Sequence, residues 1–235
     1  MKQICKLVVM LLLAFTAGVQ AQLVTYPESL NPGMPHNDDY TVRVRIPGGE
    51  WKDLFEYNVQ VDMDNVQNAS MVQFDMGSAV EVMVKKNNGS VREVTIRPLS
   101  KGIEYKQIQN AILFTLEKPQ YLSIEFDGDR LHNLHLFANP LETEKYDKET
   151  KGIMYFGPGV HRPKDLPNNQ IRIPGNTTVY LAPGAVVKAK LLVDKAENVR
   201  IIGRGILDHP IRGIEVTDSK NVLIDGITVV NPDHY

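Results

Sequence analysis

The chain has 235 residues, of which 43% are hydrophobic and 23% are charged, with 17 Gly and 14 Pro. This is an ordinary globular composition and excludes collagen-like and intrinsically disordered chains. The 26 basic and 28 acidic residues give a net charge of −2 without a basic run, so we expect no nucleic-acid partner and no electrostatic attachment to anionic membranes.

The first 21 residues have the layout of a secretory signal peptide. Lys2 and Lys6 precede the apolar run LVVMLLLAF, and the small residues of AGVQA follow it. The apolar run is shorter than the roughly 20 residues that span a bilayer, so we expect export to the periplasm or the extracellular space and no membrane anchor. Cleavage is predicted between Ala21 and Gln22. The single cysteine, Cys5, lies in this leader, so the mature chain has no disulfide and no cysteine metal site.

Residues 38–142 contain a series of short strand patterns. In YTVRVRI at 40–46, three aliphatic residues alternate with two arginines, the period of a half-buried strand. Further patterns are MVQFDM (71–76), AVEVMV (79–84), REVTIRP (92–98), AILFTLE (111–117), YLSIEFD (121–127) and LHLFA (134–138). Asn88-Gly89 suits a type I′ turn and predicts that 79–84 and 92–98 pair as a hairpin. The frequent turns and the lack of a helical period predict an antiparallel β-sandwich.

The segment LETEKYDKETKG at 141–152 is rich in charge and has few residues to bury. Such a segment is typical of a domain boundary. We therefore expect a sandwich domain over residues 22–145 and a second domain over 146–235, after a leader of 21 residues.

The second domain repeats itself. NVRIIGRGILDHP at 198–210 is followed 23 residues later by NVLIDGITVVNPD at 221–233, and GNTTVYLAPGAVVKAK aligns with both when Thr178 is placed over Asn198 and Asn221. A pair of aliphatic residues closes each repeat, at 186–187, 206–207 and 229–230. Periods of 20–25 residues without a helix predict a parallel β-helix, with coils stacked at roughly 4.8 Å.

Two residue types in these repeats resemble ligand motifs. Asn198 and Asn221 are better explained as a buried asparagine ladder that stacks between coils and bonds to turns. Gly203 and Gly226 lack the helix that a phosphate-binding loop requires, so they are expected to form tight bends.

The phrases MYFGPGVHRP, TVYLAPGAVVKA, NVRIIGRGILD and NVLIDGITVVNP resemble the opening coils of right-handed parallel β-helix polysaccharide hydrolases, the polygalacturonase family (glycoside hydrolase family 28), with a pectate-lyase-like solenoid. A sandwich ahead of the helix is similar to the dextranase and isopullulanase relatives. The resemblance is specific over 153–235 and rests on layout over the sandwich. It departs at His209, where such proteins commonly have Gly.

The resemblance implies inverting hydrolysis of a polysaccharide by an acid and a base that lie roughly 6.5–9.5 Å apart. The family's catalytic signatures are Asn-x-Asp, Asp-Asp, Gly-His-Gly and Arg-x-Lys, on coils later than these. Matches at 37–39 and 162–164 lie outside the coils, so no catalytic residue is assigned in this chain. We expect an N-terminal portion that is inactive by itself and needs no cofactor or metal.

A few further residues are candidates for ligand contact. Asp233, His234 and Tyr235 end the last coil, near where a substrate cleft is expected, and are predicted to contact substrate.

Other groups favour a structural role. Trp51, Phe55 and Tyr57 alternate on one face and are better explained by core packing than by sugar stacking. His132 and His135 point opposite ways on a strand and do not form a metal site.

Three functions remain open: a secreted glycoside hydrolase, a polysaccharide lyase on the same fold, and a non-catalytic carbohydrate-binding module. We favour them in that order. A lyase needs calcium-binding carboxylates and a basic residue, which these coils do not show, and a binding module needs an exposed aromatic row.

Overall fold

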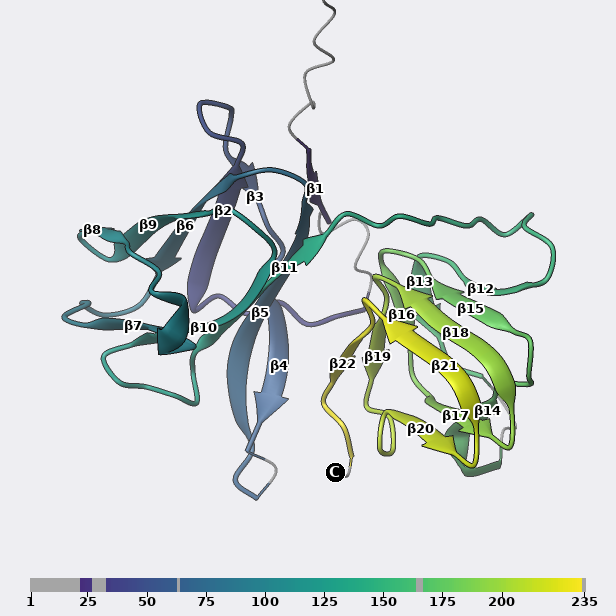
Figure 1. Ribbon diagram of the computed structural model, residues 1–235. Helices are drawn as coiled ribbons and strands as arrows, with labels where there is room; N and C mark the ends of the chain where they lie inside the picture. The colour runs from purple at the N-terminus through teal and green to yellow at the C-terminus, as the bar shows by residue number, and fades with distance from the viewer. Residues whose placement is uncertain (1–21, 27–32, 63, 164–166, 234–235) are drawn as a thin grey trace, which may run out of the picture.

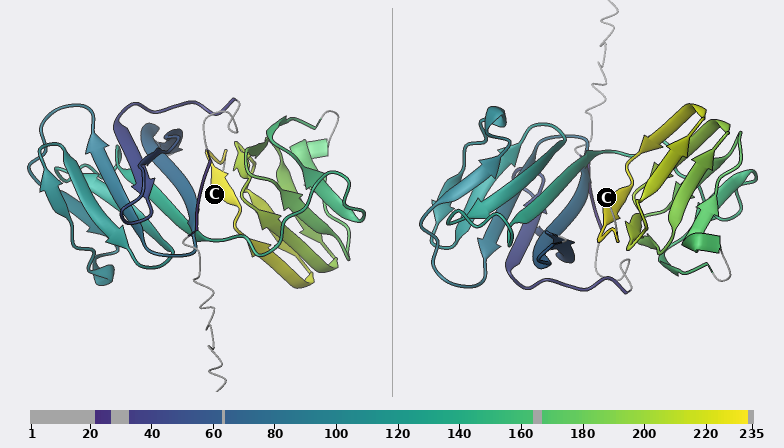
Figure 2. Two further views of the ribbon diagram at one scale, coloured as in Figure 1. Left: turned by 90° about the horizontal axis from the view of Figure 1, so that it is seen from above. Right: turned by 90° about the horizontal axis from the view of Figure 1, so that it is seen from below.

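The computed structural model describes residues 22–26, 33–62, 64–163 and 167–233, so the leader with Ala21, and His234 and Tyr235, lie outside the described residues. Two all-β regions lie side by side and are joined by residues 141–152 (Figure 1, Figure 2). The all-β prediction, with a parallel β-helix in its second part, is confirmed.

The first region is a sandwich. Its strands are β1 (Leu23–Thr25), β2 (Tyr40–Arg45), β3 (Lys52–Asp53), β4 (Tyr57–Val61), β5 (Gln67–Met76), β6 (Val80–Lys86), β7 (Val94–Arg97), β8 (Lys106–Ile108), β9 (Ala111–Leu116), β10 (Gln120–Phe126) and β11 (Leu134–Pro140). A short 3₁₀ helix (Leu99–Lys101) follows β7. In the described chain, one sheet has the order β1-β5-β11-β10-β7 with β4 on β5, and the other has the order β3-β2-β6-β9-β8.

The two sheets bury one aliphatic and aromatic core between them. Val42 on β2, Val82 on β6 and Phe74 on β5 are fully buried within it. Alternation of apolar and polar residues along each strand places these side chains on the inner faces. The pairing is antiparallel except between β5 and β11, which run parallel.

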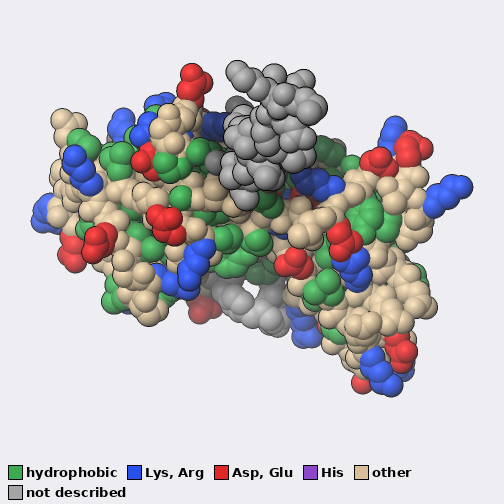
Figure 3. Space-filling model, turned by 45° about the horizontal axis from the view of Figure 1, so that its top comes forward, with side chains coloured by type: hydrophobic (Ala, Val, Ile, Leu, Met, Phe, Trp, Pro, Cys, Tyr) green, Lys and Arg blue, Asp and Glu red, His purple; other side chains and the backbone are tan. Residues whose placement is uncertain are grey.

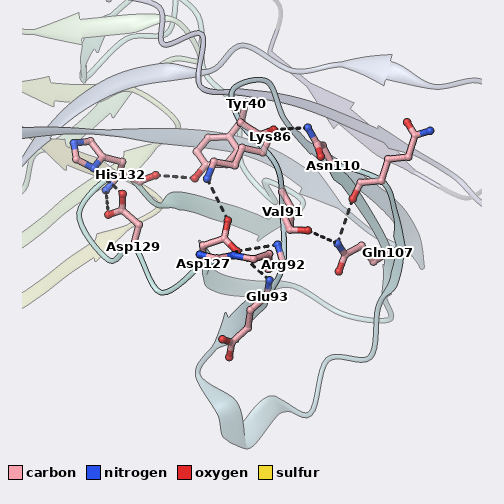
Figure 4. Close-up of polar contacts among 12 residues, drawn as sticks. Tyr40, Lys86, Val91, Arg92, Glu93, Gln107, Asn110, Asp127, Asp129 and His132 are labelled. Atoms are coloured by element: carbon pink, nitrogen blue, oxygen red, sulfur yellow. Dashed lines mark hydrogen bonds and ion pairs between the residues drawn. The ribbon is translucent and has the colours of Figure 1, made fainter.

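The predicted hairpin at Asn88-Gly89 is wrong. β6 pairs with β2 and β9, whereas β7 pairs with β10 in the other sheet. Asp127, just after β10, explains the crossing: its Oδ1 accepts the backbone N–H groups of Arg92 and Glu93 at 2.8 and 3.1 Å (Figure 4). These bonds hold the segment before β7 against β10, and they lower the pKa of the Asp127 carboxyl. The local turn signal could not show this distant partner.

The second region is a parallel β-helix of about three turns. Its strands are β12 (Ile153–Phe156), β13 (Gly159–His161), β14 (Gln170–Arg172), β15 (Thr178–Leu181), β16 (Ala185–Val187), β17 (Lys190–Asp194), β18 (Glu197–Gly203), β19 (Ile206–Asp208), β20 (Ile214–Thr217), β21 (Lys220–Asp225) and β22 (Thr228–Val230), with a 3₁₀ helix (Pro167–Asn169) before β14. They form the parallel sheets β12-β15-β18-β21, β13-β16-β19-β22 and β14-β17-β20.

The predicted stacking of Asn198 on Asn221 is confirmed, and Asn176 extends the ladder by one member, but the side chains are exposed and not buried as expected. Asn198 Nδ2 donates to Asn176 Oδ1 at 3.0 Å, and Asn221 Nδ2 donates to Asn198 Oδ1 at 2.7 Å. All three have φ between 52° and 57°, a left-handed conformation that Asn tolerates. The ladder is solvent-exposed, so it stabilises the turns from outside the core.

The predicted alignment of the repeats needs two corrections. Val179 pairs with Ile201, so the first repeat is displaced by two residues and starts at Asn176, not at Thr178. Leu207 pairs with Val229, so the last closing pair is Thr228-Val229. Gly203 is a tight bend as predicted: its φ is 127°, and a Cβ there would collide with the carbonyl oxygen of Leu181.

The two regions meet over an interface cluster. It consists of Met34, Phe55, Tyr57, Val59, Ala69 and Met71 from the sandwich, with Val186, Ile206 and Val230 from β16, β19 and β22. Phe55 and Tyr57 are buried as predicted, with ring centroids 4.8 Å apart. Trp51 does not share their face, because it lies under the Arg45 guanidinium at 4.3 Å.

A buried ion pair lies beside this cluster. Arg204, between β18 and β19, donates from Nε to Asp75 Oδ1 at 2.8 Å and from NH2 to the carbonyl of Pro140 at 2.6 Å. The Arg204 and Asp75 side chains are 4% and 2% exposed. The pair therefore joins the coils to β5 of the sandwich and to the end of β11.

Candidate functional site

The first candidate site is a coil-edge cluster of Lys188, Asp208, His209 and Asn231. All four residues end or directly follow neighbouring strands of one parallel sheet, so coil stacking brings them together. Lys188 Nζ lies 2.5 Å from Asp208 Oδ2, and Asn231 Nδ2 donates to Asp208 Oδ1 at 2.8 Å. His209 Nδ1 lies 2.7 Å from the same Oδ1.

The environment of Asp208 favours its ionised form. Burial by itself would raise the pKa of this carboxyl, but the hydrogen bonds from Lys188 and Asn231 outweigh burial and leave the pKa below its usual value. A general acid needs a raised pKa. Its contacts with Lys188 on one neighbouring coil and Asn231 on the other make Asp208 the centre of an ion pair that joins three coils.

The predicted substrate residue Asp233 lies next to this cluster. It is exposed, and its backbone N–H donates to the carbonyl of Pro210 at 3.2 Å. Asn231, two residues earlier, accepts the backbone N–H of Gln60 on β4 at 2.7 Å. The end of the last coil is thus held against the sandwich, and His234 and Tyr235 follow it outside the described residues.

A second candidate site is a linker pocket of about 240 Å³ between residues 140–144 and the strands β18 and β21. Glu142, Glu144, Arg200 and Asp225 line it. The Glu142 carboxyl accepts the Tyr180 hydroxyl at 3.1 Å, and burial raises its pKa. Arg200 donates to Glu144 at 2.9 and 2.5 Å and holds the pKa of Glu144 at about 2.

The linker pocket thus contains two carboxyls whose pKa values move in opposite directions, but Glu144 is bound by Arg200 through both of its oxygens and is not free to act as a base. Sequence reasoning missed it, because the charged run at 141–152 was interpreted only as a boundary. The available signal was Tyr146, an aromatic residue in that run; its ring packs edge-on against Tyr180 with centroids 5.5 Å apart.

His132 and His135 belong to neither the coil-edge cluster nor the linker pocket, although His135 lines a hollow that Asn231 also lines. His132 Nδ1 is 2.9 Å from Asp129 Oδ2, and the backbone N–H of His132 donates to Asp129 Oδ1, which makes a local turn (Figure 4). His135 lies on β11. Within the described residues, no group of three or more His, Cys, Asp and Glu side chains is placed to hold a metal ion.

The surface carries both signs of charge. On the face shown in Figure 3, basic and acidic side chains are interspersed over both regions. Over the part of the chain that the structure describes, no helix has the length and apolar character to cross a membrane.

Comparison with known proteins supports the fold. No family model matches the chain, and no curated protein matches it. The structure is similar to that of Dex49A from Penicillium minioluteum, a β-helix glycoside hydrolase, with a TM-score of 0.60 and 17% sequence identity. The match covers 90% of this chain, and so takes in both regions, and 60% of the Dex49A chain. The comparison therefore supports the fold of both regions, whereas a specific likeness to polygalacturonases is not supported.

Proposed function

We propose that the protein is an exported glycoside hydrolase that cleaves a polysaccharide with inversion. The observation that carries this proposal is the match of both regions to a β-helix glycoside hydrolase.

The described coils contribute a scaffold to this chemistry. An inverting enzyme needs a protonated carboxyl and an ionised one on opposite sides of the scissile bond. Asp208 is held ionised by Lys188 and lies inside the coil edge. We therefore assign the acid and base to coils beyond β22, and we assign substrate contact to Asp233, His234 and Tyr235 at the end of the last coil.

Reducing-end release from pectic and glucan polymers tests the activity. The assay compares residues 22–235 with a chain that includes all residues encoded after Tyr235 in the same reading frame. We expect release only by the longer chain, because general acid–base catalysis alone contributes roughly 10²–10⁴-fold. Turnover by residues 22–235 that is lost in Asp208→Asn, Asp225→Asn or Asp233→Asn would show that the catalytic coils are already present. Unsaturated products would show a lyase.

Export is tested separately. Gln22 already contacts the sandwich, because its carbonyl accepts the backbone N–H of Gly77 at 3.0 Å, and β1 begins at the next residue. A chain that begins at Gln22 therefore keeps this edge strand. We expect N-terminal sequencing of protein recovered outside the bacterial cytoplasm to begin at Gln22. A soluble product that retains Met1 would contradict export by this leader.

A further inference from the structure

At one end of the coil strands, successive coils contact successive strands on the outer face of the sandwich. Arg204, at the entry to β19, bonds to Asp75 on β5. Gly226 lies at the corresponding bend one coil later, and it lines a cavity with Asn139 on β11. Asp75 and Asn139 face each other across the β5–β11 pair. At this end of the coil strands, one coil step therefore corresponds to one strand step on the sandwich, and the next strand in that sheet is β10. At the other end, Asn231 of the last coil still contacts β4.

The sandwich face beyond β22 is open. Tyr121 on β10 is 58% exposed, although it lies on the sheet face whose other end carries the interface cluster. Leu99, in the 3₁₀ helix after β7, is 67% exposed beside it. A cavity of about 520 Å³ lies over β10 and β11, lined by Tyr121, Phe137, His135 and Leu99 among others. Two smaller cavities share Phe137 and reach Thr228 and Val229 on β22. Together they form a groove that runs from β10 to the edge of the last coil.

Two polar groups of the groove floor, Arg97 and Ser123, already have partners within the sandwich. Arg97 donates to Glu125 at 2.7 Å, and Ser123 accepts the Asn133 side chain at 2.6 Å. What the floor offers a new occupant is mainly aromatic and aliphatic surface, with Tyr121 packed edge-on against Phe137 at 5.5 Å.

The edge of the solenoid beside the groove is open in the same way. Leu207 is fully buried and Val229, its partner in the next coil, is 41% exposed. Ile201 is fully buried, and its partner Ile224 is 44% exposed. The inward-facing rows thus continue to the last coil, where they lack a covering layer.

We propose that this groove is the docking floor for a further parallel β-coil. One strand of that coil pairs in parallel with β22, and its outward side chains cover Tyr121 and Phe137 as β16 and β19 cover Tyr57 and Met71. The proposal deepens the proposed function and rests on it, because the catalytic coils then stand on the open half of the sandwich. The occupant is polypeptide with alternating aliphatic residues, since coil contacts and floor contacts are both apolar.

The absence of cysteine after residue 5 permits a direct test. Tyr121→Cys places a single thiol in the groove of residues 22–235. Thr115→Cys, at an exposed site on β9 of the other sheet, is the matched control. Each variant is made in the 22–235 chain and in a chain that repeats residues 210–231 once after Asn231. This 22-residue insertion adds one coil in the β19–β22 register.

We expect the added coil to slow maleimide labelling of the Cys variant at 121 by tenfold or more, without changing labelling at 115. Equal labelling at 121 in both chains, or loss of cooperative unfolding on extension, would overturn the proposal, because a coil that fits must add contacts. Slower labelling at 121 of the unextended chain in the presence of dextran or polygalacturonate would overturn the proposal and indicate a glycan-binding surface. Labelling at 121 that slows as the protein concentration rises would overturn it and indicate contact with a second copy of the chain. The labelling experiment does not measure turnover. If the added coil slows labelling at 121 but the longer encoded chain releases no reducing ends, only the proposed function is rejected.

Discussion

The sandwich and the coils use the same alternation of aliphatic residues, but only the sandwich closes its core. Val42 and Val84 face each other from neighbouring strands and are fully buried, because the second sheet lies over them. In the coils, Ile201 is fully buried while its partner Ile224 is 44% exposed. A stack buries each layer with the next one, so its end stays open. The difference predicts that the two regions respond differently to separation and to substitution.

Separating the regions has the largest expected effect. We expect residues 22–145 to fold alone, with β-type circular dichroism and a cooperative melt, because their core lies between two sheets of their own. Residues 146–235 alone should not melt cooperatively, because about three coils are near the minimum at which repeats stabilise one another. The freed sandwich should self-associate at high concentration through Phe55 and Tyr57, which the coils cover. A non-cooperative melt of 22–145 would refute the division at residue 145.

The buried ion pair between the regions comes next. Arg204→Met leaves the Asp75 carboxylate buried without its cation, which costs about 3–5 kcal/mol in the free energy of unfolding. The matched control is Arg172→Met, which removes a pair with Asp194 at 2.8 Å in which the arginine is 59% exposed. That change should cost less than about 1 kcal/mol. Similar urea midpoints for the two variants would show that Arg204 does not hold the regions together.

The sequence predicted each region well and their contact poorly. Periodicity within the second region predicted the coils, since parallel stacking makes Val199, Ile201 and their partners repeat at nearly constant spacing. The first repeat was misaligned because Thr178-Val179 mimics the Asn-Val start that Asn176 marks two residues earlier. Asp75 and Arg204 are 129 residues apart in the chain, and a lone Arg between two glycines carries no sign of its partner. The hairpin predicted at Asn88-Gly89 was wrong for the same reason. The bonds that hold the start of β7 beside β10 come from Asp127, which is distant from the turn in the chain.

Alanine substitutions at two stacked positions of the coils compare the stability contributed by a covered side chain with that of an uncovered one. Ile201→Ala removes a fully buried side chain between two coils and should lower the free energy of unfolding by about 2–5 kcal/mol. Ile224→Ala, in the same row and register, should cost about 1 kcal/mol because nearly half of that side chain is already exposed. Denaturation of both variants of residues 22–235 measures the difference. Equal losses would mean that the last coil is covered in solution.

The smallest expected effect concerns the Asp208 ion pair, and it depends on pH. The pKa of Asp208 is lower in the folded chain than its unfolded value of about 3.9, so its ionisation stabilises the fold above that pH. This contribution is lost as the pH falls through the folded pKa.

Asp208→Asn should lower the free energy of unfolding by about 1–3 kcal/mol at neutral pH, because Lys188 loses its charged partner. Urea midpoints of wild type and variant should converge on acidification. Asp233→Asn, at an exposed site on the next coil, should follow wild type throughout. A constant gap between Asp208→Asn and wild type down to the lowest pH would show that the charge of Asp208 does not stabilise the coil edge.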